Sequence, residues 1–247
     1  KMLLKKMVLS RTYQQQSISN PTLDQKDPEN LLLARANATR LPAEIIRDNA
    51  LKVSGLLNPK VGGESVRPYQ PKGLWKEKNN FSTFLLEYEE SKGEDLYRRG
   101  LYTFIRRTSP PPNMLTFDAT SREVCAVKRE ITSTPLQALV LLNDPQFFEA
   151  SRIFAERMIK SKDRLDEQIR FGFRLATARY PKKEELDILV ELYNSQYQYY
   201  KQNRNKAYQV LSVGKKPRDM NLYSVKTAAM TMVANTLLNH DETYTKR

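Results

Sequence analysis

The residues with the clearest capacity for chemistry form an arginine-rich stretch that ends in three prolines. Arg98-Arg99 and Arg106-Arg107 lie shortly before Pro110-Pro111-Pro112. A guanidinium group binds carboxylate, sulfate or phosphate through two parallel hydrogen bonds, and a rigid proline turn fixes where such groups point. The stretch therefore predicts either an anion-binding surface or internal ion pairs. The expected internal partners lie in the segment that follows: Asp118, Glu123 and Glu130.

A second candidate is the glycine-rich loop Gly62-Gly63, which is followed by Arg67 and Tyr69. Adjacent glycines let backbone amides converge on an anion, and Arg67 would add charge. The spacing matches neither common phosphate-binding pattern, so a glycine-rich crossing over a helical core is the favoured interpretation. Together, the candidate binding residues are Arg67, Tyr69, Arg98, Arg99, Arg106, Arg107, Asp118, Arg129 and Glu130.

Catalysis by paired carboxylates is a further hypothesis. Glu44 and Asp48 are one helical turn apart, where they repel each other unless a cation such as Arg40 or Arg47 lies nearby. Spacing on one helix does not establish a catalytic pair. A cleft in which Glu44, Asp48, Asp118 and Glu130 converge would favour an enzyme.

Cys125 and His240 are the only residues of their kinds. An intrachain disulfide, a cysteine cluster, a two-histidine metal site and a CxxCH haem attachment are therefore excluded within this segment. Cations flank Cys125, but no base is close in sequence, so we expect a packed thiol rather than a nucleophile. We expect His240 to be a surface residue. No metal or cofactor is predicted for this segment.

The charge of the chain is strongly positive, with 41 Lys and Arg against 28 Asp and Glu, or +13 over 247 residues. The cations are spread along the chain, with local excesses at 1–11 and 201–218, and no nucleic-acid-binding motif accompanies them. Four tyrosines beside Lys201 offer base stacking, but packing on neighbouring helices is favoured. We therefore expect no nucleic-acid partner, and no apolar run is long enough for a membrane span. These tyrosines are Tyr193, Tyr197, Tyr199 and Tyr200.

Capping residues and apolar spacing predict the elements that position these candidates. The fold class is mainly α, a helical bundle with two long irregular Gly/Pro-rich segments and little or no β structure. Residues 1–133 combine helices with long loops, and 134–245 form the bundle, because short connections join antiparallel helices. Trp75 is expected to be packed within the first irregular segment. The expected helices cover 2–9, 28–36, 42–57, 94–107, 135–142, 145–161, 164–178, 182–202, 204–212 and 222–238, and a strand is expected at 84–90.

Four stretches of the sequence resemble the DUF1553 family, also called PSD1 domains, of planctomycete proteins that contain cytochrome c. They lie in order, from Arg40-Leu41-Pro42 to Thr134-Pro135 and beyond, and the arginine-rich stretch is the longest. Ile131 stands where the family usually has arginine. The four stretches are residues 40–48, 62–71, 97–118 and 134–147.

The resemblance implies a single domain over residues 1–245, a fragment of a larger exported bacterial protein. Upstream partners would be DUF1549-like and cytochrome-c-like domains, so haem c is expected upstream. An extracytoplasmic location, at the periplasm or cell surface, and a role in polysaccharide utilisation are implied. We therefore expect a non-catalytic scaffold or binding module that contacts anionic glycans. The alternative is part of a haem-coupled oxidoreductase or carbohydrate-active enzyme whose site is completed by upstream domains.

Overall fold

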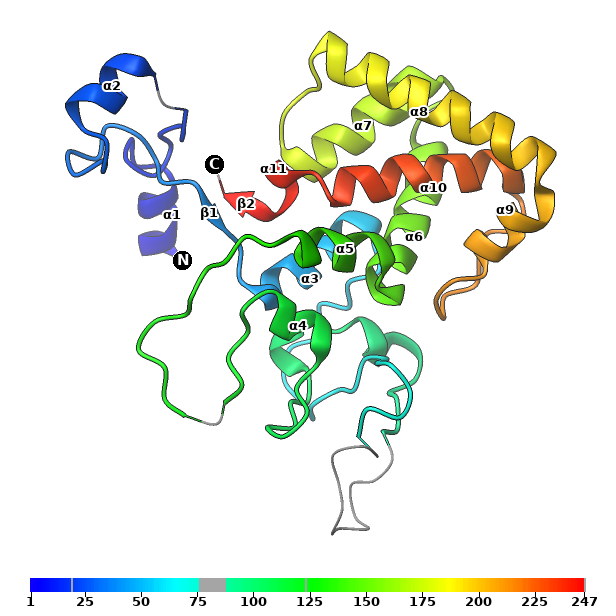
Figure 1. Ribbon diagram of the computed structural model, residues 1–247, viewed down its shortest axis with the longest axis horizontal. Helices are drawn as coiled ribbons and strands as arrows, with labels where there is room; N and C mark the ends of the chain where they lie inside the picture. The colour runs from blue at the N-terminus through cyan, green and yellow to red at the C-terminus, as the bar shows by residue number, and fades with distance from the viewer. Residues whose placement is uncertain (19, 76–87, 123, 247) are drawn as a thin grey trace.

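The computed structural model describes residues 1–18, 20–75, 88–122 and 124–246, and its fold is mainly α, as the sequence predicts. Figure 1 shows a helical bundle at one end, an irregular half below it and an N-terminal segment to one side. The N-terminal segment carries α1 (Met2–Val8) and α2 (Pro21–Lys26). The bundle contains α5 (Pro135–Asn143), α6 (Pro145–Ser161), α7 (Leu165–Thr177), α8 (Lys183–Gln202), α9 (Arg204–Leu211) and α10 (Ser224–Leu238).

The core of the bundle lies where α10 packs along α6, with α7, α8 and α9 around α10. Side chains such as Phe154, Met158, Met230 and Val233 are fully buried there. The helix boundaries follow the sequence closely, because each begins at a proline or polar turn and keeps an apolar face. Asp144 caps α6 by accepting a hydrogen bond from the Gln146 amide, as its position before Pro145 predicts.

The irregular half contains α3 (Ala43–Ser54), two 3-10 turns and α4 (Pro112–Thr116). α3 packs on α6 and ends at Gly55, which adopts a left-handed conformation with φ of 89°. The turns are η2 (Gly93–Tyr97) and η3 (Gly100–Tyr102). Trp75 is 2% exposed, so the expectation that it is packed is confirmed.

The predicted helix over 94–107 is wrong. Arg98 and Arg99 are extended between η2 and η3, and the chain after η3 pairs with the glycine-rich loop. The Val66 amide donates to the Tyr102 carbonyl at 2.8 Å, and the Phe104 amide donates to the Val66 carbonyl at 2.8 Å. These long-range partners replace the i to i−4 bonds that the apolar spacing suggested.

The predicted helix over 28–36 is also wrong, because Asp27 closes a turn instead of capping a helix. Its carboxylate accepts hydrogen bonds from the amides of Leu31 and Leu32, both at 2.8 Å. The helix in this region is α2, capped earlier by Asn20. Of the predicted strand at 84–90, residues 84–87 lie outside the described residues and 88–90 are irregular.

A two-stranded antiparallel sheet joins the N-terminal segment to the end of the chain. β1 (Thr39–Arg40) pairs with β2 (Thr245–Lys246), with Thr39 opposite Lys246, and α11 (Asp241–Tyr244) precedes β2. No helix among the described residues is long and apolar enough to cross a membrane.

Candidate functional site

Arg98 lies at the centre of the predicted binding region, but it is 2% exposed and bound to the chain itself. Its Nη1 donates to the Glu64 carbonyl at 3.0 Å, and its Nη2 donates to the carbonyls of Lys60, at 3.3 Å, and Gly62. The guanidinium also lies 3.9 Å from the centre of the Tyr102 ring. The glycine-rich loop therefore presents carbonyls to an arginine, which is the opposite of an amide cradle for an anion.

Arg47 projects from α3 into the same region and holds the neighbouring backbone. Its Nη1 donates to the Arg98 carbonyl at 2.7 Å and its Nη2 to the Leu96 carbonyl at 2.8 Å. Its Nε donates to Oε1 of Gln146 on α6, at 2.9 Å. Burial lowers the pKa of Arg47, and the charge of Asp48 opposes this effect. Arg47 therefore fixes the two extended residues between η2 and η3 against the bundle.

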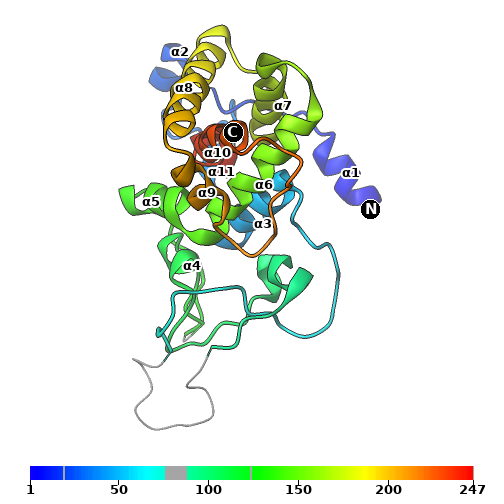
Figure 2. The ribbon, with the colours of Figure 1, turned by 90° about the vertical axis from the view of Figure 1, so that its right-hand side faces the viewer.

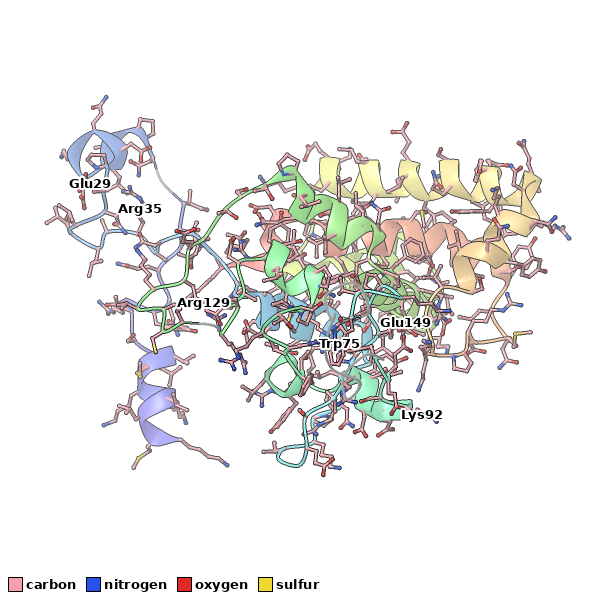
Figure 3. The ribbon with its side chains drawn as sticks, turned by 60° about the horizontal axis from the view of Figure 1, so that its bottom comes forward. Glu29, Arg35, Trp75, Lys92, Arg129 and Glu149 are labelled. Carbon is pink, nitrogen blue, oxygen red and sulfur yellow. The ribbon has the colours of Figure 1, made fainter. Side chains whose placement is uncertain are left out.

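Glu149 forms a second buried polar centre near the start of α6, with no exposed surface (Figure 3). Its carboxylate accepts hydrogen bonds from the hydroxyls of Tyr69 and Tyr97, the latter at 3.0 Å. It also accepts from the amides of Lys215 and Lys216, at 2.6 and 2.5 Å. Burial, and then the charge of Glu149, raise the pKa of both tyrosines. One carboxylate thus ties the glycine-rich loop, η2 and the segment after α9 to the bundle.

Arg152 continues this polar line along α6 and is also fully buried. It donates to Oε1 of Glu156 at 3.1 Å, to the Val213 carbonyl at 3.2 Å and to the Lys216 carbonyl. Sequence reasoning missed Gln146, Glu149, Arg152 and Glu156. Their spacing of three or four residues is typical of a solvated helix face, and only the irregular segments packed over that face reveal their role.

Arg67 and Arg106 lie against aromatic rings rather than in an open binding surface. Arg67 is 5.1 Å from the centre of the Phe104 ring, and Arg106 is 5.1 Å from the centre of the buried Trp75 ring. Each stack is worth about 0.5–2 kcal/mol, depending on burial. Arg107 is exposed, and no ion pair involves it within the described residues.

Asp118 and Arg129 hold the irregular segment that precedes α5. Asp118 pairs with Arg40, and the Thr132 amide donates to Asp118 at 2.8 Å. Arg129 binds Glu44 through two hydrogen bonds of 2.8 and 3.0 Å. The expectation that Asp118 pairs with Arg106 or Arg107 is therefore wrong. Glu130 is exposed, and Glu123 lies outside the described residues.

Three of the four carboxylates considered for catalysis make separate contacts. Glu44 binds Arg129, and Asp118 binds Arg40 and Thr132. Asp48 accepts a 2.6 Å hydrogen bond from the Gly100 amide and lies 3.9 Å from Arg99. Burial raises the pKa of Asp48. Burial alone would raise the pKa of Glu44 as well. The hydrogen bonds and charge of Arg129 outweigh burial, so the pKa of Glu44 is lowered. Each of these three carboxylates joins separate segments of this chain.

Cys125 and His240 differ from their sequence expectations. Cys125 is exposed, so the expectation of a packed thiol is wrong. Residues 124–134 around it form no helix or strand. His240 is half-buried, accepts a hydrogen bond from the Glu242 amide at 3.3 Å and lies 5.9 Å from the Phe173 ring. It caps α11 rather than lying free on the surface.

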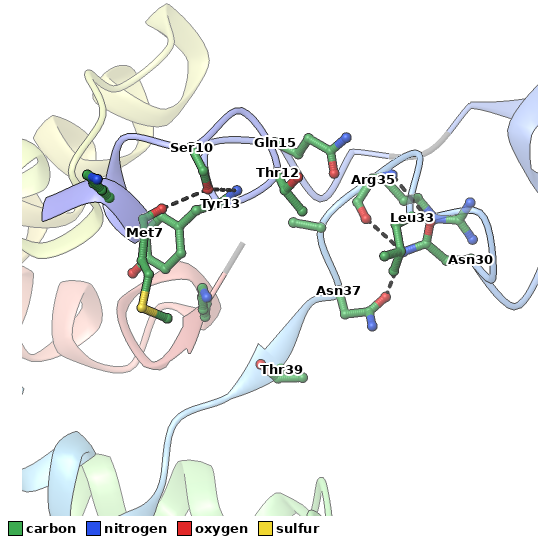
Figure 4. Close-up of a pocket in the computed structure, with 13 residues that line it drawn as sticks. Met7, Ser10, Thr12, Tyr13, Gln15, Asn30, Leu33, Arg35, Asn37 and Thr39 are labelled. Carbon is green, nitrogen blue, oxygen red and sulfur yellow. Dashed lines mark hydrogen bonds between the residues drawn. The ribbon is translucent and has the colours of Figure 1, made fainter. Parts of the chain in front are cut away.

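The described cavities lie away from most of the candidate residues. One, of about 660 Å³, lies between the end of α1 and residues 30–39 and is lined by Met7, Tyr13 and Leu33 (Figure 4). A second, of only about 10 Å³, lies beside Arg47 and Gln70, which is room for one water molecule. Among the described residues, no group of three or more His, Cys, Asp or Glu side chains is arranged to hold a metal ion.

Comparison with known proteins gives one match. A family model described as PSD1, protein of unknown function (DUF1553), matches residues 1–193. No curated protein and no solved structure matches the chain. The matched residues include α3, the glycine-rich loop, both 3-10 turns and the helices through most of α8. The chain therefore belongs to the PSD1 (DUF1553) family.

Proposed function

We propose that this chain is a non-catalytic helical scaffold module of a large exported bacterial multidomain protein. The observation that supports this proposal most strongly is the use made of Arg47 and Arg98. Their guanidinium groups bind five backbone carbonyls of the irregular half, at residues 60, 62, 64, 96 and 98. Side chains that hold the backbone in this way are not available to bind a substrate.

The N-terminal segment is the surface that we propose for docking to other domains. α1 has no buried residue, and its large apolar side chains are 48% to 79% exposed. Contiguous exposed apolar surface is typical of an interaction site. The proposed partners are the DUF1549-like and cytochrome-c-like domains that the family resemblance implies, with haem c bound upstream and the whole protein outside the cytoplasm.

Contact with anionic polysaccharide is part of the same proposal. Of the candidate residues, Arg99 and Arg107 keep exposed guanidinium groups. The alternative, part of an enzyme completed by upstream domains, has less support, because Glu44, Asp48 and Asp118 are each engaged in a different internal contact.

The experiment compares four single substitutions by denaturant unfolding. Arg47→Ala and Arg98→Ala should each lower the free energy of unfolding by about 2–4 kcal/mol, because several buried carbonyls lose their donors. Arg99→Ala and Arg107→Ala should change it by less than about 0.5 kcal/mol. Functional-site residues are commonly replaced with no loss, or a gain, of stability. Stable Arg47→Ala and Arg98→Ala variants would therefore overturn the scaffold proposal.

A further inference from the structure

A second group of cations lies on the end of α8, on α9 and on the segment that follows, and Figure 2 shows these elements next to one another. Residues 201–218 contain no carboxylate. Their six cations are Lys201, Arg204, Lys206, Lys215, Lys216 and Arg218. We call this set the basic corner.

The cations of the basic corner are mostly unneutralised. Lys215 pairs with Glu90 at 2.9 Å, and the nearest acid in sequence, Asp219, is bound by Lys160 at 2.6 Å. No ion pair within the described part of the chain involves the other five cations of the set. Four of these five are exposed, and Arg218 is half-buried. The contrast with Arg40, Arg129 and Arg152, which all bind carboxylates, is clear.

The geometry of the corner brings its charges onto neighbouring elements. Arg204 and Tyr208 are one turn apart on α9 and therefore share a face. Arg218, from the following segment, lies 5.1 Å from the centre of the Tyr208 ring. Lys216 is anchored nearby, because its amide donates to Glu149 and its carbonyl accepts from Arg152, both on α6. The segment that carries Lys215, Lys216 and Arg218 is thus attached to both α6 and α9.

The tyrosines that precede the basic corner do not form a base-stacking platform for nucleic acid. Tyr193 and Tyr197 stack on each other at 6.1 Å, and Tyr200 is 4% exposed. Only Tyr199, 47% exposed, keeps an open ring among the four tyrosines that precede the corner. Single-strand binding needs successive open rings. Recognition here would therefore depend on the charged groups, which suit sulfate or carboxylate substituents.

We infer that the basic corner binds a linear polyanion of the acidic polysaccharide class, with its cations contacting successive sulfate or carboxylate groups. This inference rests on the glycan contact in the proposed function and moves it from the arginine-rich stretch to α9 and the segment after it. Residues 201–218 also lie beyond the part of the chain that the family model matches.

The test uses the whole chain and two variants that remove the same charge. The corner variant carries Lys201→Gln, Arg204→Gln, Lys206→Gln and Lys216→Gln. The control variant carries Lys1→Gln, Lys5→Gln, Lys6→Gln and Arg11→Gln in the other basic segment. All eight side chains are exposed, so both variants should keep the fold, which circular dichroism checks. The probes are dextran sulfate, neutral dextran and single-stranded DNA, each titrated calorimetrically at several salt concentrations.

The expected result is salt-sensitive binding of dextran sulfate but not of neutral dextran, weakened about tenfold or more in the corner variant and less than about threefold in the control. Three results would overturn the inference: no binding by the unmodified chain, equal weakening in both variants, or tighter binding of DNA at the same corner. Each of these results leaves the scaffold proposal standing, since that proposal depends on the unfolding experiment.

Discussion

The bundle and the irregular half of this protein are stabilised in different ways. In the bundle, the backbone groups of α6 and α10 bond within each helix, and apolar side chains such as Phe154 and Val233 fill the space between them. In the irregular half, long stretches of the backbone lie outside helices, and the guanidinium groups of Arg47 and Arg98 donate hydrogen bonds to carbonyls there. Buried backbone carbonyls need partners wherever they lie. Arginine side chains thus supply hydrogen-bond donors to backbone carbonyls of the irregular half, whereas backbone amides within each helix supply them in the bundle.

The largest expected effect is at Glu149, where the two regions meet. Glu149→Gln places an amide among four hydrogen-bond donors and leaves Arg152 with less neutralising charge. The free energy of unfolding should fall by about 3–5 kcal/mol, measured by denaturant titration. Glu191→Gln, at an exposed position in the middle of α8, is the control and should change it by less than about 0.5 kcal/mol. A small effect at Glu149 would mean that this carboxylate does not join the two regions.

Arg47→Lys tests whether the forked shape of arginine matters or only its charge. One ammonium group cannot reach the carbonyls of Leu96 and Arg98 and the side chain of Gln146 together. We expect a loss of about 2–3 kcal/mol in unfolding free energy. Arg99→Lys, which keeps the charge beside Asp48 at a site where the side chain is 43% exposed, should be nearly neutral. Equal effects of the two substitutions would contradict the role given to Arg47.

Gly214→Ala tests the close approach of the segment after α9 to the buried carboxylate. A Cβ atom at Gly214 would lie 2.4 Å from Cδ of Glu149, and φ there is +95°. Gly55→Ala is a matched control, because φ is +89° but no atom lies within 4 Å of the added Cβ. Backbone strain alone should cost about 1 kcal/mol at Gly55, and we expect at least twice that at Gly214. Similar melting temperatures for the two variants would show that Glu149 can move aside.

The smallest expected effect is a pH dependence within the bundle. Arg179 binds Glu185 at 2.6 Å and lowers the pKa of Glu185 to about 2, below its usual value of 4.5. The stabilisation is therefore complete above about pH 4.5 and is lost as the pH falls towards 2. Glu185→Gln should flatten the loss of melting temperature over that interval, whereas Glu184→Gln should not. An unchanged pH profile in Glu185→Gln would contradict the assignment.

The contrast between the two regions also explains what the sequence could predict. The helix over 145–161 was predictable because the capping residue Asp144, Pro145 and the apolar spacing determine it. The stretch 94–107 has the same spacing, but its backbone bonds to Arg47 and Val66, which are far away in sequence. No local pattern carries that information, so the helix prediction failed there.

In the candidate site, too, local sequence indicated some features and long-range packing determined the others. Residue types indicated that the arginines need acceptors, and Arg98 and Arg129 do bind oxygen atoms. They did not indicate that the oxygens of Arg98 are carbonyls of residues 60–64, or that Asp118 pairs with Arg40. Glu149 was missed because a buried glutamate on a helix looks like a solvated one until the segments above it are placed.

The most direct test of the central claim is a measurement of backbone mobility at residues 61–66 in the unmodified chain and in Arg98→Ala. Amide order parameters from NMR relaxation should be near the rigid value of about 0.85 at Gly62, Glu64 and Val66 in the unmodified chain and below about 0.6 in Arg98→Ala. Those of α10 should be the same in both proteins. A loop that stays rigid without Arg98, or one that is already mobile with it, would contradict the claim that arginine side chains hold the irregular half together.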